Sequence, residues 1–155
     1  MNKEADVLKV DGLPIVSANF CWSVGVLMEK FLKALGSKKF MAIKCPKCGY
    51  ICVPPRSRCV RCNTKMGEKD LIELSGKGTL VSYTVAHVEL DGKANFKDLE
   101  KPKLIGAIKP DDADSTIFMP LGEVEPKDLK TGMKVSLQWN KDTKGELTDI
   151  KYFKP

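Results

Sequence analysis

The sequence lacks the features that would place the chain in a membrane or in an oxidising compartment. No apolar run approaches the ~18 residues that a membrane-spanning helix requires. The stretch "MNKEADVLKVDGLPIV" at the N-terminus alternates charged with apolar residues and has no signal-peptide hydrophobic region. We therefore expect a cytoplasmic protein with reduced thiols, in which clustered cysteines indicate a metal site rather than disulfides.

Signals of catalysis are also scarce. The chain has a single histidine, His87, and no G-x-S-x-G motif, Walker A motif or dinucleotide-binding fingerprint. The glycine-rich stretch "SGKGT" leads into a strand pattern, so it lacks the helix N-terminus of a phosphate-binding loop. The acidic residues lie in turn-like segments without a local pairing for acid–base chemistry. These absences predict a protein that is not an enzyme, with His87 as a partly buried structural imidazole.

Arginine is confined to one short stretch, and the net positive charge lies in the same half of the chain. Arg56, Arg58 and Arg61 are followed by residues 71–155, which carry no arginine and have thirteen lysines against fourteen acids. Residues 45–70 carry six basic residues against two acidic ones, within a formal net charge of +6. A basic first half could meet the phosphates of a nucleic acid or of a nucleotide cofactor, or it could be a solvated lysine-rich surface.

The first 39 residues predict a helix after an irregular lead-in. The stretch "FCWSVGVLMEKFLKALG" at 20–36 has helical periodicity, with Ser23 as a possible cap and Gly36 as its end. Its apolar face has residues at i, i+3, i+4, i+7 and i+11: Val24, Leu27, Met28, Phe31 and Leu35. This face can pack on the chain's own core, or it can dock on another protein.

The hydrophobic period changes to two after residue 70. Five strands are predicted, at 78–90, 103–110, 115–124, 133–140 and 146–153. Turn-forming stretches such as "PDDADS" and "KDTKGE" separate them. Five strands in this length predict a small Greek-key barrel of the OB type, ahead of a β-sandwich, which has about seven strands. The predicted domains are thus 1–39, a metal-binding segment at 40–70, and 71–155.

Five of the six cysteines lie in one stretch, "CPKCGYICVPPRSRCVRC" at 45–62. Cys45 and Cys48 form one C-x-x-C knuckle, and Cys59 and Cys62 form a second. Two such knuckles bring four sulfurs into a tetrahedron, which zinc accepts. Four thiolates leave no position open for water, so the site is predicted to be structural. A rubredoxin-type iron centre is the alternative metal.

The residues beside the knuckles support this interpretation. Gly49 and Asn63 follow the second cysteine of each pair, and both residue types tolerate the left-handed conformation in which such turns often end. Cys52 breaks the knuckle spacing, so we interpret it, like Cys21, as a small buried hydrophobe. The predicted fold is therefore mainly β, with an N-terminal helix and a rubredoxin-like zinc ribbon followed by an OB-fold barrel.

The order of these parts resembles a widespread prokaryotic family of rubredoxin-like zinc ribbons fused to an OB-fold, catalogued as domain of unknown function thirty-five. The resemblance covers residues 20–153, and its most specific parts are "CPKCG", "PPR", "SGKGTLVSYT" and "GMKV". It implies a non-catalytic accessory or scaffold protein that binds CoA or acyl-CoA and partners a thiolase or a related acyl-CoA enzyme. Asn63 departs from the glycine of many such ribbons.

The resemblance directs attention to the arginines as ligands of the CoA phosphates. Arg56 comes first, because two prolines stiffen its approach and it lies in the "PPR" motif. Arg58 and Arg61 follow, with exposed charge or an interdomain contact as the alternative for each. The rival function is single-stranded nucleic-acid binding, which zinc ribbons and OB-folds support elsewhere. The acidic balance of residues 71–155 and their lack of arginine argue against it.

Overall fold

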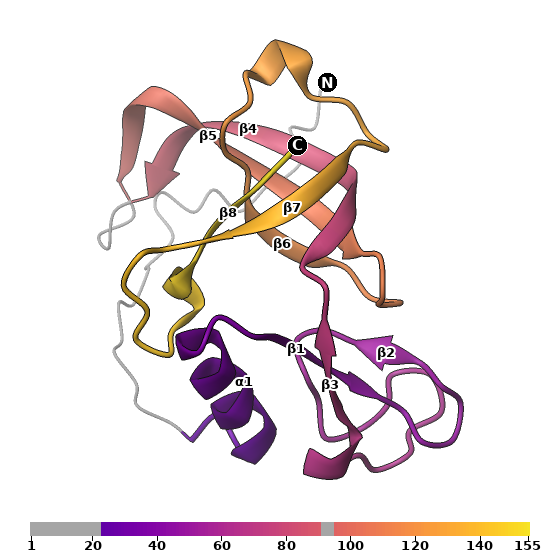
Figure 1. Cartoon of the computed structure of the whole chain (residues 1–155). Helices are drawn as coiled ribbons and strands as arrows, with labels where there is room; N and C mark the ends of the chain where they lie inside the picture. The colour runs from indigo at the N-terminus through magenta and orange to yellow at the C-terminus, as the bar shows by residue number, and fades with distance from the viewer. Residues whose placement is uncertain (1–22, 91–94) are drawn as a thin grey trace, which may run out of the picture.

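The computed structural model describes residues 23–90 and 95–155. Within these ranges one α-helix leads into a small three-stranded sheet, and a five-stranded sheet follows (Figure 1). Short 3₁₀ turns lie at Glu68–Asp70, Pro126–Asp128 and Leu147–Asp149. Within the described residues no helix has the length and apolar character needed to cross a membrane.

Helix α1 spans Val26–Gly36, so its end agrees with the prediction and its start does not. Residues 20–22 of the predicted helix lie outside the described residues, and residues 23–25 are not helical. The N-cap is Gly25, whose φ of 78° no other common residue adopts easily, and no side chain caps the helix. Ser23 is therefore not the cap; its hydroxyl accepts a hydrogen bond from the Gly25 N–H at 3.4 Å.

The helix packs on the chain's own core through the C-terminal part of its predicted apolar face. Phe31 and Leu35 are fully buried, whereas Leu27 and Met28 are half-buried and Val24 is exposed. The sequence left open whether this face meets the chain itself or a partner. The structure shows that its C-terminal half meets the chain itself.

The ribbon contains a three-stranded antiparallel sheet that the hydrophobic periodicity did not reveal. Its order is β2 (Ile51–Cys52), β1 (Phe40–Lys44) and β3 (Leu71–Leu74). These strands have two to five residues, which is too short for a period-two pattern to stand out. β3 pairs with β1, so ribbon pairing continues past residue 70. The domain boundaries at 39/40 and 70/71 remain a prediction.

The second sheet holds the five strands predicted after residue 70, all antiparallel, in the order β6-β5-β4-β7-β8. The strands are β4 (Lys77–Leu90), β5 (Phe96–Pro110), β6 (Ile117–Pro120), β7 (Lys134–Trp139) and β8 (Ile150–Lys154). β5 begins seven residues earlier than predicted. The mainly β fold with an OB-fold domain is therefore confirmed.

The five-stranded sheet curls towards closure without completing a barrel. Its edge strands meet through one isolated parallel bridge between Leu121 and Phe153. The Gly122 N–H donates to the Phe153 carbonyl at 3.0 Å beside it. Gly122 is needed at this point, because a Cβ there would lie 2.5 Å from the ring of Tyr152. Such partial closure is usual for an OB-fold.

One hydrophobic core joins the helix, the ribbon sheet and the OB-fold. The rings of Phe31 on α1 and Phe40 on β1 lie 6.4 Å apart between centroids, and the Phe40 and Phe153 rings are also 6.4 Å apart. All three side chains are buried. This aromatic chain fixes the helix and the start of the ribbon on the OB-fold.

Candidate metal centre and adjoining cavity

The structure brings the four predicted ligand cysteines together at the tip of the ribbon. The sulfurs of Cys45, Cys48, Cys59 and Cys62 all lie within 4.8 Å of one another. Two sulfur pairs, Cys45 with Cys62 and Cys48 with Cys59, are separated by 3.5 and 3.6 Å. A tetrahedron with metal–sulfur bonds of about 2.3 Å has edges of about 3.8 Å, so the cluster has the size that zinc requires.

The two knuckles that present these sulfurs have matching backbone geometry. The Gly49 N–H donates to the Cys45 carbonyl, and the Asn63 N–H donates to the Cys59 carbonyl, each at 2.9 Å. Gly49 has a φ of 74° and Asn63 has a φ of 56°. The predicted left-handed turn ends are therefore confirmed at both positions.

The sulfurs are in an environment that supports thiolates and excludes much of the solvent. Cys45 and Cys59 are buried, while Cys48 and Cys62 are half-buried. The Arg61 N–H donates to the Cys59 sulfur at 3.4 Å. The four thiols fill a tetrahedral site without an open position for water or substrate. The donor set therefore fits a structural zinc.

The protonation of the thiols depends on their neighbours. The Thr64 hydroxyl, 3.2 Å from the Cys62 sulfur, lowers the pKa of Cys62 to about 6, together with the Thr64 backbone N–H. The Tyr50 N–H favours the Cys48 thiolate, but burial and the adjacent thiols outweigh it and raise the pKa of Cys48 to about 12. Without a metal the cluster cannot hold four negative charges, so zinc binding must displace protons.

The remaining cysteines lie apart from this centre or outside the described residues. Cys52 is buried, and its sulfur lies 3.6 Å from the Pro54 carbonyl oxygen, away from the four-sulfur cluster. This agrees with its interpretation as a small buried hydrophobe. Cys21 lies outside the described residues.

The three arginines are exposed around the ribbon but do not converge on one point. Arg58 donates from its Nη1 to the Asn63 carbonyl at 3.2 Å, which holds it along the second knuckle. Arg61 lies within that knuckle, between Cys59 and Cys62. Among the described residues every ion pair uses a lysine, so none of the arginines is neutralised by a carboxylate.

Arg56 occupies a different position, at a cavity between the ribbon and the start of α1. The cavity has a volume of about 480 Å³. Its apolar wall comes from Val24, Val26, Met28 and Met66. Arg56 and Glu68 lie on the same cavity, which therefore combines apolar side chains with one cation and one carboxylate. The Glu68 carboxylate is paired with Lys30 at 3.2 Å.

The turn "PDDADS" at 110–115 connects the OB-fold to the ribbon, a role that its composition did not reveal. The Asp114 carboxylate accepts from the Ile51 N–H at 2.8 Å, and the Asp114 N–H donates to the Ile51 carbonyl at 2.9 Å. The Ser115 hydroxyl accepts from the Val53 N–H at 2.8 Å and donates to the Val53 carbonyl at 3.1 Å. These bonds fix residues 51–53, directly before the prolines that precede Arg56.

A second loop anchors the other end of the helix. The Asp149 carboxylate, 3% exposed, accepts from three successive backbone N–H groups of residues 144–146 at 2.7 to 3.0 Å. Burial alone would raise the pKa of Asp149, but these donors lower it below its ordinary value. The loop so formed places the Thr143 hydroxyl to donate to the Gly36 carbonyl at 2.7 Å. A buried carboxylate therefore supports the C-terminus of α1.

His87 is exposed, so its prediction as a partly buried imidazole is wrong. The physical reason is its place beyond the rest of the sheet. Ala86 pairs with Lys103 and Val88 pairs with Asp98, so the extra residues of this register shift, within 99–102, lie on β5 opposite His87. β7 pairs with β4 only over Lys77–Thr79 and β6 pairs with β5 only over Ile105–Ile108, so in the described part of the chain no further strand covers His87.

Comparisons with known families match both parts of the chain. The model of the ChsH2 rubredoxin-like zinc ribbon domain matches residues 32–66. The model of the ChsH2 C-terminal OB-fold domain matches residues 71–140. Both matched segments agree with the ribbon and the curled sheet described above.

Curated relatives are named scaffold proteins. A DUF35 domain-containing scaffold protein of Methanocaldococcus jannaschii is 33% identical over 97 residues, which are 61% of this chain and 63% of that protein. A protein of the same description from Methanothermobacter thermautotrophicus is 28% identical over 116 residues, 72% of this chain and 83% of that protein. The match to the first relative thus spans less than two thirds of its length.

Two solved structures share the fold. The Ltp2-ChsH2(DUF35) aldolase matches with a TM-score of 0.63 at 20% identity, covering 87% of this chain and 98% of the matched chain. A DUF35-family protein of unknown function from Sulfolobus solfataricus matches with a TM-score of 0.59 at 24% identity, covering 81% and 82% of the two chains. At these identities the matches establish the architecture.

Proposed function

The chain belongs to the ChsH2 family of rubredoxin-like zinc ribbons with an OB-fold, and we propose that it is a non-catalytic scaffold that binds acyl-CoA beside a thiolase or related acyl-CoA enzyme. Two observations support the scaffold role. Its curated relatives are named scaffold proteins. One structural neighbour is named for Ltp2 together with ChsH2(DUF35).

The absence of an evident reaction centre supports a non-catalytic role. Four cysteines gather in the metal cluster, and Cys52 is buried. His87 is exposed on β4, and among the described residues no hydrogen bond joins it to a carboxylate or thiol. A nucleophile with an adjacent base, which covalent catalysis requires, is therefore not assembled in the described part of the chain.

The observation that carries the acyl-CoA proposal is the cavity between α1 and the ribbon. Its volume of about 480 Å³ falls within the range of about 300–1,000 Å³ that small-molecule sites occupy. CoA combines phosphates with a long pantetheine arm, and the cavity combines the Arg56 cation with apolar walls. Glu68 also lines the cavity, but its carboxylate is paired with Lys30 at 3.2 Å, which reduces its repulsion of a phosphate. Arg56 would bind a phosphate, while Val26, Met28 and Met66 would contact the arm.

The zinc would act on this ligand site indirectly. Bound to Cys45, Cys48, Cys59 and Cys62, it would hold the ribbon loop that contains all three arginines. An ordered loop presents Arg56 at low entropic cost, because its backbone is already fixed when the ligand arrives. Arg58 and Arg61 lie farther along the same loop and would add favourable charge rather than direct contacts with the apolar walls.

Calorimetry with fragments of the ligand tests this assignment. We expect CoA and acetyl-CoA to bind the wild-type chain, and Arg56→Ala to weaken CoA binding by about 10-fold, the loss expected of a hydrogen bond to a charged group. Pantetheine, which lacks the phosphates, should bind both proteins equally. Lys141→Ala, an exposed cation on another loop, is the control for net charge.

Two outcomes would contradict the proposal. Equal loss of CoA affinity in Arg56→Ala and Lys141→Ala would show that only net charge matters. Binding of a single-stranded oligonucleotide with a steep salt dependence, and no response to CoA, would favour the nucleic-acid alternative.

A further inference from the structure

The outer face of the five-stranded sheet carries an uncharged surface across three neighbouring strands. Phe118 on β6 pairs with Ala107 on β5, which pairs with Ser82 on β4. The next row pairs Pro120 with Ile105 and Ile105 with Thr84. Paired residues of an antiparallel ladder point to the same side. We define these six residues as the outer face: Ser82, Thr84, Ile105, Ala107, Phe118 and Pro120.

This outer face is accessible rather than part of the core. The residues that alternate with them along β5 and β6, such as Leu104, Ile108 and Met119, point to the opposite side and are buried. Phe118 is 73% exposed and Ile105 is 38% exposed. None of the six residues is charged, although 30% of the chain is. An antiparallel sheet with one solvated face normally carries polar and charged residues there, so this face has the composition of a contact surface.

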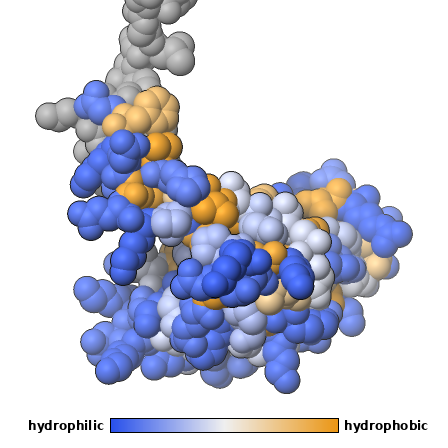
Figure 2. All heavy atoms as spheres, turned by 90° about the horizontal axis from the view of Figure 1, so that it is seen from above, coloured by the Kyte–Doolittle hydropathy of each residue, from blue (hydrophilic) through white to orange (hydrophobic). Residues whose placement is uncertain are grey.

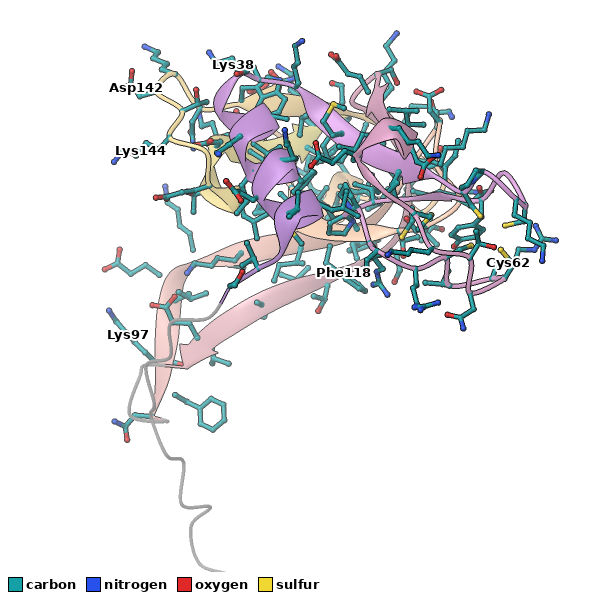
Figure 3. The ribbon with its side chains drawn as sticks, turned by 90° about the horizontal axis from the view of Figure 1, so that it is seen from below. Lys38, Cys62, Lys97, Phe118, Asp142 and Lys144 are labelled. Carbon is teal, nitrogen blue, oxygen red and sulfur yellow. The ribbon has the colours of Figure 1, made fainter. Side chains whose placement is uncertain are left out.

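The same two central strands extend beyond the sheet as a two-stranded arm, defined here as residues 86–90 and 96–103. β6 pairs with β5 only over Ile105–Ile108, and β7 pairs with β4 only over Lys77–Thr79. The ribbon with its side chains shows the arm reaching away from the body, with Lys97 on the projecting part and Phe118 nearer the body (Figure 3). Within the described ranges no third strand covers either edge of the arm.

Within the described residues, little besides its own two strands stabilises the arm. A two-stranded hairpin alone in water is marginal, and its open edges expose unpaired N–H and C=O groups. Phe96 is 74% exposed and Val88 is 43% exposed on it. Hydrophobic surface lies between hydrophilic side chains on the projecting part of the molecule (Figure 2). Strand edges and exposed apolar groups together are what a protein partner covers by strand addition or apolar contact.

Charge distinguishes a protein partner from a polyanion. The arm carries three lysines and three acidic residues, so its formal charge is zero. Lys103 pairs with Glu89 across the two strands. The excess positive charge lies instead on the ribbon, where residues 45–70 carry six basic against two acidic residues. A neutral arm and an uncharged face have no net positive charge to attract phosphates. Their composition is instead typical of the weakly charged centre of a protein interface.

We propose that the outer face and the arm form the docking surface for the acyl-CoA enzyme that this chain serves. The inference rests on the proposed function, and it adds the side of the scaffold on which the enzyme sits. The enzyme would contribute an apolar patch against Phe118 and Ile105 and would cover an edge of the arm. The ribbon cavity with Arg56 would stay open to the ligand, because it is built by α1 and the ribbon rather than by the outer face.

Binding measurements with a thiolase test the docking surface. The full chain is co-expressed with the thiolase of the same organism, and affinity is measured by biolayer interferometry after the zinc content of each variant is checked. We expect Phe118→Asp and Phe96→Asp each to weaken the complex by about 10-fold or more, as charges placed at the centre of an interface do. Leu147→Asp, on a 52% exposed leucine outside this surface, should change the affinity by less than about 2-fold.

The possible outcomes separate this inference from the proposed function. A wild-type complex that neither Phe118→Asp nor Phe96→Asp weakens would overturn the docking surface and leave the scaffold role intact. No complex with the wild-type chain would overturn the scaffold role for this enzyme and the docking surface together. Self-association of the chain that is lost in Phe118→Asp would assign the face to a second copy instead and would overturn the inference.

Discussion

The ribbon and the OB-fold are stabilised in different ways. The ribbon's own buried cluster has five residues, of which three are cysteines: Ile43, Cys45, Cys52, Cys59 and Met66. The larger cluster is formed mainly by the OB-fold and draws in residues of α1 and β1. Small units with little apolar core depend on metals or other cross-links, whereas larger ones are stabilised by burial. In this chain a ribbon that depends on its metal is adjacent to an OB-fold that is stabilised by apolar burial.

The two regions also differ in charge, and this difference separates their proposed tasks. The ribbon has all three arginines, exposed and without carboxylate partners in the described structure. The OB-fold has none, and its outer face is uncharged. A small anionic ligand would therefore meet the ribbon, and a protein would meet the OB-fold.

The largest expected effect comes from breaking the metal centre. Cys59→Ser removes one of four ligands, and structural zinc supplies about 10 kcal/mol or more of binding free energy in small zinc domains. We expect loss of stoichiometric zinc, measured by mass spectrometry of the native protein, and loss of amide-exchange protection in β1 and β3. Protection in β5 and β7, which belong to the OB-fold core, should persist.

Cys52→Ala is the matched control, because Cys52 is in the same loop but its sulfur is outside the cluster. It should keep its zinc. Chelator-resistant, stoichiometric zinc in Cys59→Ser would contradict the ligand assignment, and so would loss of zinc in Cys52→Ala alone.

The metal centre could be predicted from the sequence because its signal is local. Two C-x-x-C pairs fix four sulfurs through short turns, and the φ angles at Gly49 and Asn63 follow from the same turns. The OB strands β4, β5 and β6 were visible for a related reason, since parts of each alternate between buried and less buried residues. Helix α1 was visible through Phe31 and Leu35, although residues 23–25 of the predicted helix are not helical.

What the sequence did not reveal depends on contacts between distant residues. The pairing of β1 with β3 joins Phe40 to Leu74 across more than thirty positions. The bonds from Asp114 and Ser115 to the ribbon span more than sixty. The amino-acid sequence of a turn rich in aspartate is the same whether its carboxylates face water or accept a hydrogen bond from a distant backbone N–H. The exposure of His87 likewise depends on the neighbouring strands, because the register shift opposite it falls on β5 and neither β6 nor β7 extends that far.

A large-to-small substitution in the OB-fold core tests the region that is stabilised by apolar burial. Leu80 is fully buried, so Leu80→Ala should lower the free energy of unfolding by about 3 kcal/mol through lost burial and a residual cavity. Zinc should remain bound, since the ribbon cluster does not include Leu80. Denaturant titration measures the effect. Val81→Ala, at the adjacent exposed position, should cost less than about 1 kcal/mol; equal costs at both positions would contradict the assigned core.

The smallest expected effect comes from loosening the connection between the two regions. Asp114→Ala removes the acceptor of the Ile51 N–H, but this bond is exposed and water can replace it. We expect a loss of about 1 kcal/mol or less. Faster amide exchange at residues 51–53, with zinc content unchanged, is the specific signature of a ribbon less firmly held on the OB-fold. Asp142→Ala, another exposed aspartate, for which no hydrogen bond or ion pair is seen, is the control. Equal exchange in both variants would show that the shared aromatic core of Phe31, Phe40 and Phe153 suffices to hold the two regions together.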